Sequence, residues 1–349
     1  MFEQIIYEDI KKIYENKVIV WKKLANKKIL ITGANGFIVN YIINLLIFLN
    51  LEKDFKIKIF LTSRNKEKTK KKFINRKTAK FIKILSHDLK EKLKLTEKVD
   101  YIIHAASNAS PKYYKNFPIE TILPNVIGTY NLLLYASRVK VKSFIFFSSG
   151  EVYGNSKNNT LKEDELFSFN TLDLRSSYVE SKKMGETLCY SFYRQKKVPI
   201  KILRIFHTYG PSMNLEDGRV MMDFVKNAKQ NKKIMVKGDG RQKRCFCYIS
   251  DLIEGIFIGL LKGKNGEAYN LSNNREFYSI ERLAQTVSKL INKKEIKFVK
   301  RDKQDAYLAS PFSKVYPSIK KILKLGFKPK VTIEKGFKRT IDYYKSLKE

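Results

Sequence analysis

The stretch Ile31-Thr32-Gly33-Ala34-Asn35-Gly36-Phe37-Ile38-Val39 decides the fold class of this 349-residue chain. A short strand-like run over residues 28–32 leads into it, and an apolar helical segment over residues 41–49 follows it. In such a strand–turn–helix unit, Gly33 permits the tight turn, Gly36 lets the backbone approach a pyrophosphate, and the helix N-terminus supplies amide donors. The stretch therefore predicts a dinucleotide site, although a glycine pair alone would also suit a purely structural turn.

Two features of this region affect the cofactor prediction. Val39 occupies the third glycine position, so we expect the helix to pack slightly further from the strand. At the end of the second expected strand, Arg64 stands where an acidic residue would bind a ribose 2′-hydroxyl. Arg64 could meet a 2′-phosphate or be a solvated loop cation, and the sequence therefore predicts NAD or NADP.

Apolar runs rich in β-branched residues alternate with amphipathic segments along the first 206 residues. This alternation predicts an α/β fold, a Rossmann-type doubly wound parallel sheet with helices on both faces. The expected strands are residues 28–32, 56–61, 81–85, 101–104, 143–147 and 200–205.

Beyond residue 207 the pattern loosens, and glycine turns separate shorter elements. We expect a smaller C-terminal α/β domain that completes a cleft. The predicted organisation is an N-terminal helical extension over residues 1–26, a Rossmann domain over 27–206 with a returning segment at about 245–265, and a substrate domain that takes up most of 207–349.

Composition narrows the class of protein. With 43% hydrophobic residues the chain can bury a large core, its apolar runs are too short to span a membrane, and the acidic residues near the N-terminus argue against a secretory signal. We therefore expect a soluble, cytoplasmic protein. The three cysteines lack the spacing of a metal site or disulfide framework.

The net charge of +36 by itself suggests a polyanionic partner. However, the lysines are scattered, and the densest run, residues 66–72, has no interleaved aromatic side chains. We expect neither a nucleic-acid nor a membrane partner, and a basic composition of this kind suits a small anionic substrate.

Two polar groups point to acid/base chemistry. Ser148 and Ser149 end the fifth expected strand, and Tyr178 and Lys182 follow in a helical segment. Residues at i and i+4 share a helix face, so the ammonium group of Lys182 could lower the pKa of the Tyr178 phenol and hold a nicotinamide ribose. Because this pattern also occurs by chance on helix surfaces, the upstream glycine turn is what favours hydride-transfer catalysis.

Seven ordered segments resemble one family, the extended short-chain dehydrogenases/reductases of the NAD-dependent epimerase/dehydratase group. Within it the likeness is greatest to UDP-glucuronate decarboxylases. The segments are His104-Ala105-Ala106-Ser107-Asn108-Ala109-Ser110-Pro111, Asn125-Val126-Ile127-Gly128-Thr129, Ser149-Gly150-Glu151-Val152-Tyr153-Gly154, Arg175-Ser176-Ser177-Tyr178, His207-Thr208-Tyr209-Gly210-Pro211, Asp217-Gly218-Arg219-Val220 and Gln242-Lys243-Arg244-Cys245-Phe246.

The resemblance implies a tightly bound, recycled NAD or NADP and a nucleotide-sugar substrate, with a UDP-sugar favoured. The catalytic residues would be Tyr178, Lys182, Ser149 and Glu151. The cofactor would contact Gly33, Asn35, Gly36, Phe37, Ile38, Arg64, Asp88, Leu89, Ala105, Ala106, Ser107, Asn125, Ser148, Tyr178 and Lys182. The substrate would contact Ser110, Glu151, Arg175, His207, Tyr209, Arg219 and Arg244, and no metal is expected.

The implied reaction passes through a 4-keto sugar, from which a C6 carboxylate is lost as carbon dioxide, and would supply precursors of a surface polysaccharide. Gly150 departs from the family, whose dehydratases carry an Asp there and whose decarboxylases usually carry a Ser. Dehydration would lose its acid, whereas decarboxylation needs none at that position. A C4 dehydrogenase or 4-keto reductase, a C4 or C5 epimerase, and a catalytically silent dinucleotide-binding protein remain alternatives.

For two residues the sequence also allows a purely structural role: Glu151 could cap a local loop, and His207 could be a structural histidine. The resemblance also implies a homodimer formed by two helices of the large domain, one of which carries Tyr178.

Overall fold

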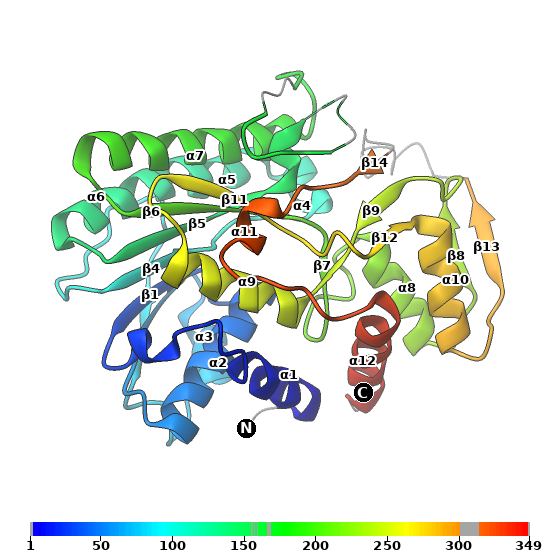
Figure 1. Ribbon diagram of the computed structural model, residues 1–349, viewed down its shortest axis with the longest axis horizontal. Coiled ribbons are helices and arrows are strands. Elements are labelled where there is room, and N and C mark those ends of the chain that lie inside the picture. The colour runs from blue at the N-terminus through cyan, green and yellow to red at the C-terminus, as the bar shows by residue number, and fades with distance from the viewer. Residues whose placement is uncertain are drawn as a thin grey trace.

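A seven-stranded parallel sheet forms the larger of two lobes (Figure 1). The computed structural model describes residues 3–347 except 155, 157, 159, 166–168 and 301–313. The strand order is β11-β6-β5-β4-β1-β2-β3, and each neighbouring pair is parallel. The strands are β1 (Lys28–Thr32), β2 (Lys58–Ser63), β3 (Ile82–Ser86), β4 (Tyr101–His104), β5 (Ser143–Ser149), β6 (Ile200–Ile205) and β11 (Glu267–Leu271).

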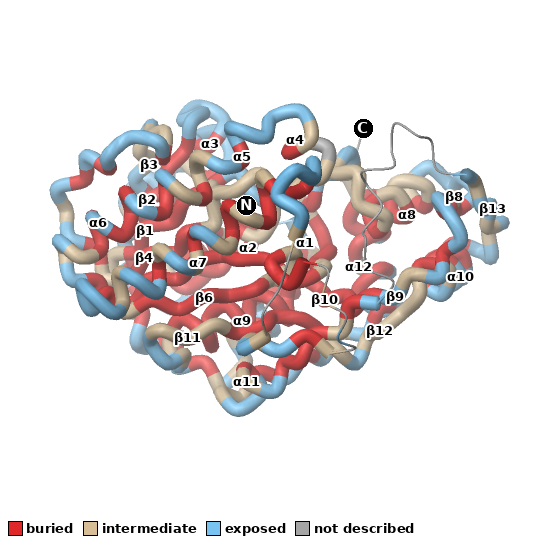
Figure 2. The backbone as a smooth tube through the Cα atoms, turned by 90° about the horizontal axis from the view of Figure 1, so that it is seen from above, coloured by how far each residue is buried: buried red, intermediate tan, exposed pale blue. Residues whose placement is uncertain are grey.

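Helices cover both faces of this sheet, and each face has its own hydrophobic core. Successive side chains of a strand point to opposite faces, so Ile29 and Ile31 of β1 join one core and Leu30 joins the other. The first core is covered by α2 (Phe37–Lys53) and α9 (Ile249–Lys262), and the second by α6 (Thr129–Val139) and α7 (Ser176–Lys196). Figure 2 shows the buried backbone of the strands between these layers.

Shorter helices complete the large lobe. The segment from α5 (Pro118–Leu123) through a π-helical turn into α6 is continuous, and it packs against α7. The bounds are η1 (Trp21–Leu24), α3 (Lys66–Phe73), α4 (Pro111–Asn116), α5 (Pro118–Leu123), η2 (Pro124–Gly128), η3 (Gly150–Tyr153) and α11 (Lys320–Leu323).

The smaller lobe packs three helices around short strands. Its helices are α8 (Val220–Lys229), α10 (Ile280–Leu290) and α12 (Ile333–Ser346), which contact one another. Its strands are β7 (Thr208–Tyr209), β8 (Ile234–Lys237), β9 (Lys243–Cys245), β10 (Cys247–Tyr248), β12 (Phe277–Ser279), β13 (Ile296–Val299) and β14 (Lys314–Val315).

The predicted fold class is confirmed, and all six predicted strands are present with ends shifted by at most two residues. The seventh strand, β11, was not predicted. It lies beyond residue 207 in the sequence but pairs with β6, so the segment that returns to the large sheet reaches Leu271 rather than about residue 265. Short strands that follow a glycine turn give little periodic signal, which explains the omission.

The N-terminal segment begins with a helix that contacts both lobes. In α1 (Gln4–Tyr14), the buried Asp9 accepts hydrogen bonds from Tyr41 of α2 at 3.2 Å, Tyr248 of β10 at 2.7 Å and Arg339 of α12 at 3.0 Å. Burial raises the pKa of Asp9 against the opposing effect of the Arg339 charge. Asp9 therefore connects α2, the helix that follows the glycine turn, to the C-terminal helix α12.

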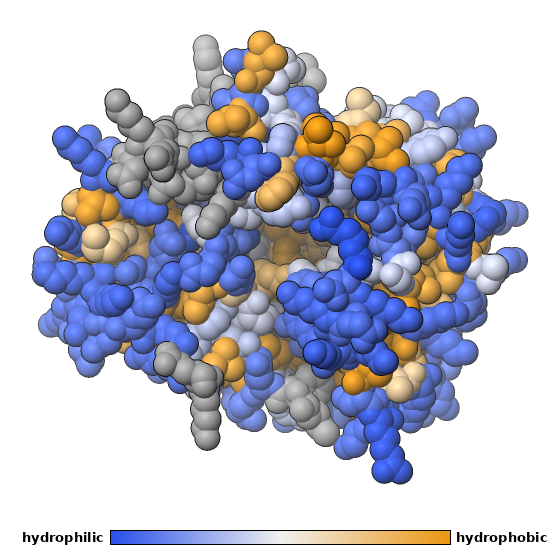
Figure 3. Space-filling view, turned by 180° about the vertical axis from the view of Figure 1, so that it is seen from behind, coloured by the Kyte–Doolittle hydropathy of each residue, from blue (hydrophilic) through white to orange (hydrophobic). Residues whose placement is uncertain are grey.

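Positive charge is spread over the molecule. The lysine run at residues 66–72 forms most of α3, and Figure 3 shows hydrophilic side chains covering most of one whole face. No helix within the described ranges has the length and apolar character required to cross a membrane.

Candidate active site

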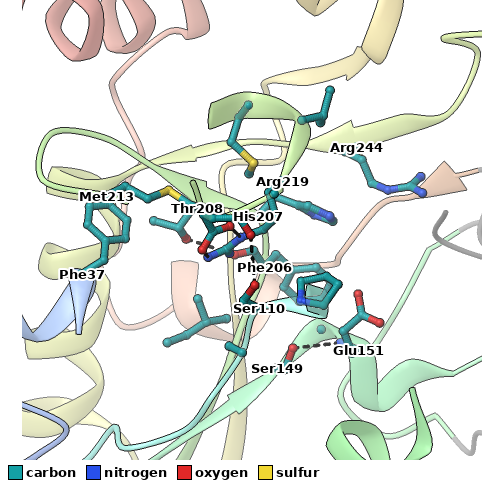
Figure 4. Close-up of a pocket in the computed structure, with 18 of the residues that line it drawn as sticks. Phe37, Ser110, Ser149, Glu151, Phe206, His207, Thr208, Met213, Arg219 and Arg244 are labelled. Atoms are coloured by element: carbon teal, nitrogen blue, oxygen red, sulfur yellow. Dashed lines mark hydrogen bonds and ion pairs between the residues drawn. The ribbon is translucent and has the colours of Figure 1, made fainter. Parts of the chain in front are cut away.

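A cavity of about 1040 Å³ is lined by both lobes. Its wall consists of the loops that follow β1, β4, β5 and β6, together with residues of α7, α8 and β9. This position, at the carboxyl ends of parallel strands, is where open α/β sheets bind ligands. Figure 4 shows Phe37, Ser110, Ser149, Glu151, Arg219 and Arg244 arranged around it.

The glycine turn forms one end of this cavity. Gly33 has φ +77°, and a Cβ there would lie 2.9 Å from the Cα of Ala106, so a side chain is excluded. Gly36 is the N-cap of α2 and lines the cavity together with Asn35, Phe37 and Ile38. A helix N-terminus without a side chain at its tip suits a pyrophosphate.

Of the other residues predicted to contact the cofactor, some line the cavity and others lie outside its wall. Ala105, Ser107 and Ser148 line the cavity, and the buried Ser107 hydroxyl has no hydrogen-bond partner among the described residues. Arg64 is exposed at the end of β2, Asp88 pairs with Lys90 at 3.4 Å, and Leu89 is buried in the core. These last three residues are not part of the cavity wall, so their assignment to the cofactor stays a prediction.

The acid/base group is assembled where α7 meets the end of β5. Tyr178 and Lys182 lie one turn apart on α7, and the Ser149 hydroxyl hydrogen-bonds Tyr178. Lys182 Nζ donates to the Phe147 carbonyl at 2.7 Å, and burial lowers the pKa of Lys182 to about 7. Asn125, in the π-helical turn behind them, donates to Ser181 Oγ at 3.0 Å, and its buried Oδ1 has no partner in the described part of the chain.

Burial raises the pKa of Tyr178 to about 12. The Tyr178 ring is enclosed and stacked on Tyr114 with ring centroids 5.5 Å apart, while Lys182 directs its ammonium group to a backbone carbonyl. The effect of Lys182 on the Tyr178 phenol stays a prediction. Ser149 and the more distant Arg219 and Arg175 only partly oppose the effect of burial.

Ser148 has a different role from Ser149. Its hydroxyl donates to Glu186, which also forms an ion pair with Arg204 at 2.8 Å. Glu186 lies one turn beyond Lys182 on α7, so it belongs to the same helix face. Ser148 therefore lines the cavity but directs its side chain into a buried ionic network.

The opposite wall is rich in arginine. Arg175 pairs with Glu151 at 2.8 Å, and Arg219 forms a bidentate pair with Asp217, with Nη2 and Oδ2 2.9 Å apart. Arg244 is 3% exposed, and burial followed by the nearby Arg175 charge lowers its pKa to about 10. Three guanidinium groups facing one cavity suit a ligand with several negative charges.

His207 lies among these arginines and stays neutral. Burial, and then the positive charges of Arg244, Arg219 and Arg175, lower its pKa to about 3. Its Nδ1 is buried without a hydrogen-bond partner among the described residues. Ser110, on the same wall, donates to the carbonyl of Asp217 at 3.0 Å.

Tyr209 does not reach the site, in contrast to the sequence prediction. It is fully buried, stacks on Phe337 of α12 at 4.4 Å and directs its hydroxyl to the carbonyl of Ile333. Because the ring of Tyr209 packs on Phe337 of α12, it is enclosed in the hydrophobic core instead of lining the cavity.

The sequence analysis missed Tyr114 and Phe206, which line the cavity, and Glu186, which holds Ser148 from outside the cavity wall. Glu186 has a signal, the i+4 spacing from Lys182, and Phe206 precedes the motif that carries His207. Tyr114 has no sequence signal, since a short helix after a loop brings it against Tyr178.

The position of the Phe206 ring leaves no room for a side chain at Gly150. A Cβ at Gly150 would lie 2.6 Å from both Cδ1 and Cε1 of Phe206. The ring of Phe206 thus occupies the place that a serine or aspartate would need. Within the described residues, no three His, Cys, Asp or Glu side chains are grouped to hold a metal ion.

Comparisons with known proteins place this site in a family. Residues 29–272 match the model of the NAD dependent epimerase/dehydratase family. The chain is 37% identical over 312 residues to UDP-glucuronic acid decarboxylase 3 of Arabidopsis thaliana, which covers 89% of this chain and 87% of that protein. It is 34% identical over 321 residues to UDP-glucuronic acid decarboxylase 1 of Xenopus tropicalis, covering 91% and 72%.

Solved structures agree in fold. The UDP-glucuronic acid 4-epimerase of Bacillus cereus, in complex with NAD, superimposes with a TM-score of 0.74 at 25% identity and covers 91% of this chain and 96% of that one. The family resemblance stated from the sequence is thereby confirmed. The chain belongs to the NAD-dependent epimerase/dehydratase family.

Proposed function

We propose that this protein is an NAD-dependent decarboxylase of a UDP-glucuronate-like nucleotide sugar and acts through a 4-keto intermediate. The observation that carries the proposal is the meeting of Tyr178, Ser149 and Glu151 in one cavity with three arginines. The names of the relatives, which are 34–37% identical over most of the chain, support the substrate class.

The choice of NAD over NADP rests on the family description and on Arg64. An arginine that binds a 2′-phosphate would be expected at the cavity, whereas Arg64 is exposed outside its wall. When bound, NAD would supply the hydride acceptor for C4, return the hydride later, and add a positive charge that favours the Tyr178 phenolate.

The residues of the chain move the protons. Tyr178 takes the proton of the C4 hydroxyl, which Ser149 positions from the end of β5. The resulting C4 ketone makes the C6 carboxylate a β-keto acid, so carbon dioxide leaves without an acid at the Gly150 position. Arg219 and Arg244 neutralise the diphosphate, and Glu151 acts on the proton of C5.

A second candidate is an epimerase. A C5 epimerase must remove and replace the C5 proton, and Glu151, which forms an ion pair with Arg175, lines the cavity as a candidate base. A C4 epimerase needs only the return of the hydride to the other face of the ketone. The Bacillus cereus relative, named as a UDP-glucuronic acid 4-epimerase, has the same fold.

The test is incubation of the purified protein with UDP-glucuronate and NAD, with the Tyr178→Phe variant as control. We expect the nucleotide-sugar mass to fall by one carbon dioxide, with carbon dioxide released, in the parent protein alone. An unchanged mass with a new C4 or C5 isomer would replace decarboxylation by epimerisation. Binding of both ligands without any product would leave a silent dinucleotide-binding protein.

We also propose a homodimer formed by α6 and α7, as the resemblance implied. Apolar side chains on these helices and on α5 are exposed, including Ile119 at 64%, Tyr130 at 44%, Leu134 and Met184. Tyr130 and Leu134 are four residues apart and share one face of α6. Figure 1 places these helices at its upper left, which becomes the upper right in the reversed view of Figure 3. Apolar surface is visible there.

A cytoplasmic location is also proposed. It is supported by Cys189, Cys245 and Cys247, all of which are buried free thiols, as is usual in a reducing compartment.

A further inference from the structure

The ion pair between Glu151 and Arg175 raises a problem for the proposed reaction. Arg175 Nη2 lies 2.8 Å from Glu151 Oε2, and the two side chains are 8% and 24% exposed. A guanidinium group in this position stabilises the carboxylate form of Glu151. Once carbon dioxide has left, however, C5 needs a proton, and a carboxylate cannot give one.

The other groups around Glu151 do not solve this problem. Its backbone N–H donates to Ser149 Oγ, and the charge of Glu151 acts on Arg244 of β9, Tyr178 of α7 and Tyr114 of α4. Tyr178 keeps the proton that it takes from the C4 hydroxyl, because it must return this proton to O4 when the ketone is reduced again. Burial raises the pKa of Tyr114, which therefore holds its own proton, and Arg244 remains a cation.

Charge balance changes when a substrate enters. Among the described charged side chains that line the cavity, Arg175, Lys182, Arg219, Lys237 and Arg244 stand against Glu151, Asp217, Asp223 and Asp239, which leaves one net positive charge, and His207 is neutral. A diphosphate brings about two negative charges and a sugar carboxylate one more, which leaves about two net negative charges among these groups. The filled site therefore favours the uptake of a proton.

We propose that Arg175 exchanges partners during the reaction: the sugar carboxylate takes Arg175 away from Glu151, and the released Glu151 takes up a proton. The sugar carboxylate is a suitable competitor because it has the charge and the two-oxygen geometry of Glu151 itself. The inference rests on the proposed function, and it gives Arg175 two partners in turn, the Glu151 carboxylate and the sugar carboxylate.

The bonds, the electron pair and the proton are all accounted for over one turnover. The C5–C6 bond breaks, its electron pair stays on the sugar as the C4–C5 enolate, and carbon dioxide leaves. The O–H bond of Glu151 then breaks, and its proton forms the new C–H bond at C5 as the C4 ketone is restored. With no sugar carboxylate left, the Glu151 carboxylate pairs with Arg175 again, as in the structure.

The experiment measures proton uptake on binding rather than turnover. NAD-loaded Tyr178→Phe protein, which holds the substrate unreacted, is titrated at pH 7 with UDP-glucuronate or with UDP-glucose, in two buffers of different ionisation enthalpy. UDP-glucose carries the same diphosphate but no carboxylate, so it subtracts the contribution of the nucleotide. We expect UDP-glucuronate to bind with about one more proton taken up per site than UDP-glucose.

Three further variants assign the proton. In the same background, Glu151→Gln and Arg175→Gln should each abolish the difference, because one lacks the acceptor and the other lacks the exchange. Arg282→Gln is the matched control. Arg282, on α10, lies over the ring of Tyr278 and is not part of the cavity wall, so this variant should leave the difference intact. The Glu151→Gln result decides even where the Arg175 variant does not fold.

The outcomes separate the two proposals. Equal proton uptake for both sugars, or a difference that persists in Glu151→Gln, overturns the exchange, while carbon dioxide release by the parent protein still supports decarboxylation. If UDP-glucuronate does not bind at all, both the exchange and the proposed function are wrong.

Discussion

The Gly150→Ala substitution tests how the cavity is built. The new Cβ would lie 2.6 Å from two atoms of the Phe206 ring, about 1 Å closer than an ordinary carbon–carbon contact. The ring is 6% exposed and packs on Tyr153 with centroids 5.9 Å apart, so it has little room to withdraw. Overpacking of this kind costs about 1–3 kcal/mol.

Urea unfolding and substrate kinetics report the two effects. We expect the free energy of unfolding to fall by about 1–3 kcal/mol and KM for the nucleotide sugar to rise, because the displaced Phe206 ring lines the cavity. The double variant Gly150→Ala with Phe206→Leu serves as control, since a smaller side chain relieves the overlap and the two changes should be non-additive. An unchanged unfolding free energy in Gly150→Ala, or simple additivity in the double variant, would refute the steric reasoning.

Three more predictions follow from other parts of the molecule. Tyr178→Phe should lower kcat by about 10²–10⁴-fold with nearly unchanged nucleotide-sugar binding, measured by steady-state kinetics and calorimetry, and undiminished turnover would remove Tyr178 from the mechanism. Burial raises the pKa of Glu254 to about 7 from its ordinary 4.5, so the folded state binds the proton more tightly and the stability that it contributes is lost as pH rises through this window. Glu254→Gln should therefore flatten the decline of the unfolding free energy between these pH values by up to about 3 kcal/mol, and an unaltered pH slope would contradict the shift. Leu134→Glu should convert the proposed dimer to a monomer in light scattering, because a charge would be buried in an apolar interface; a dimer of unchanged mass would place the interface elsewhere.

The sequence determined the architecture because its signals are local. A glycine turn between a strand and a helix, and the alternation of strand and helix patterns, depend only on neighbours along the chain. They fixed β1 (Lys28–Thr32), β4 (Tyr101–His104) and β6 (Ile200–Ile205) to the residue. The i, i+4 spacing likewise brought Tyr178 and Lys182 to one face of α7.

The electrostatic state of the site was decided by tertiary structure. The sequence contained Glu151, Arg175 and Ser148, but it could not show that Arg175 pairs with Glu151 or that Ser148 is bound to Glu186. The desolvation that raises the pKa of Tyr178 likewise depends on which distant side chains enclose the ring.

A residue that lies within a family-like motif does not always line the cavity. Tyr209 lies within a family-like segment, yet it is fully buried against Phe337, 128 residues later in the chain. The sequence by itself thus determined the family and the sheet, since these follow from local pattern. Only the tertiary structure decided which of the candidate site residues face the cavity, which are paired and which are desolvated, because packing between distant segments sets burial and charge.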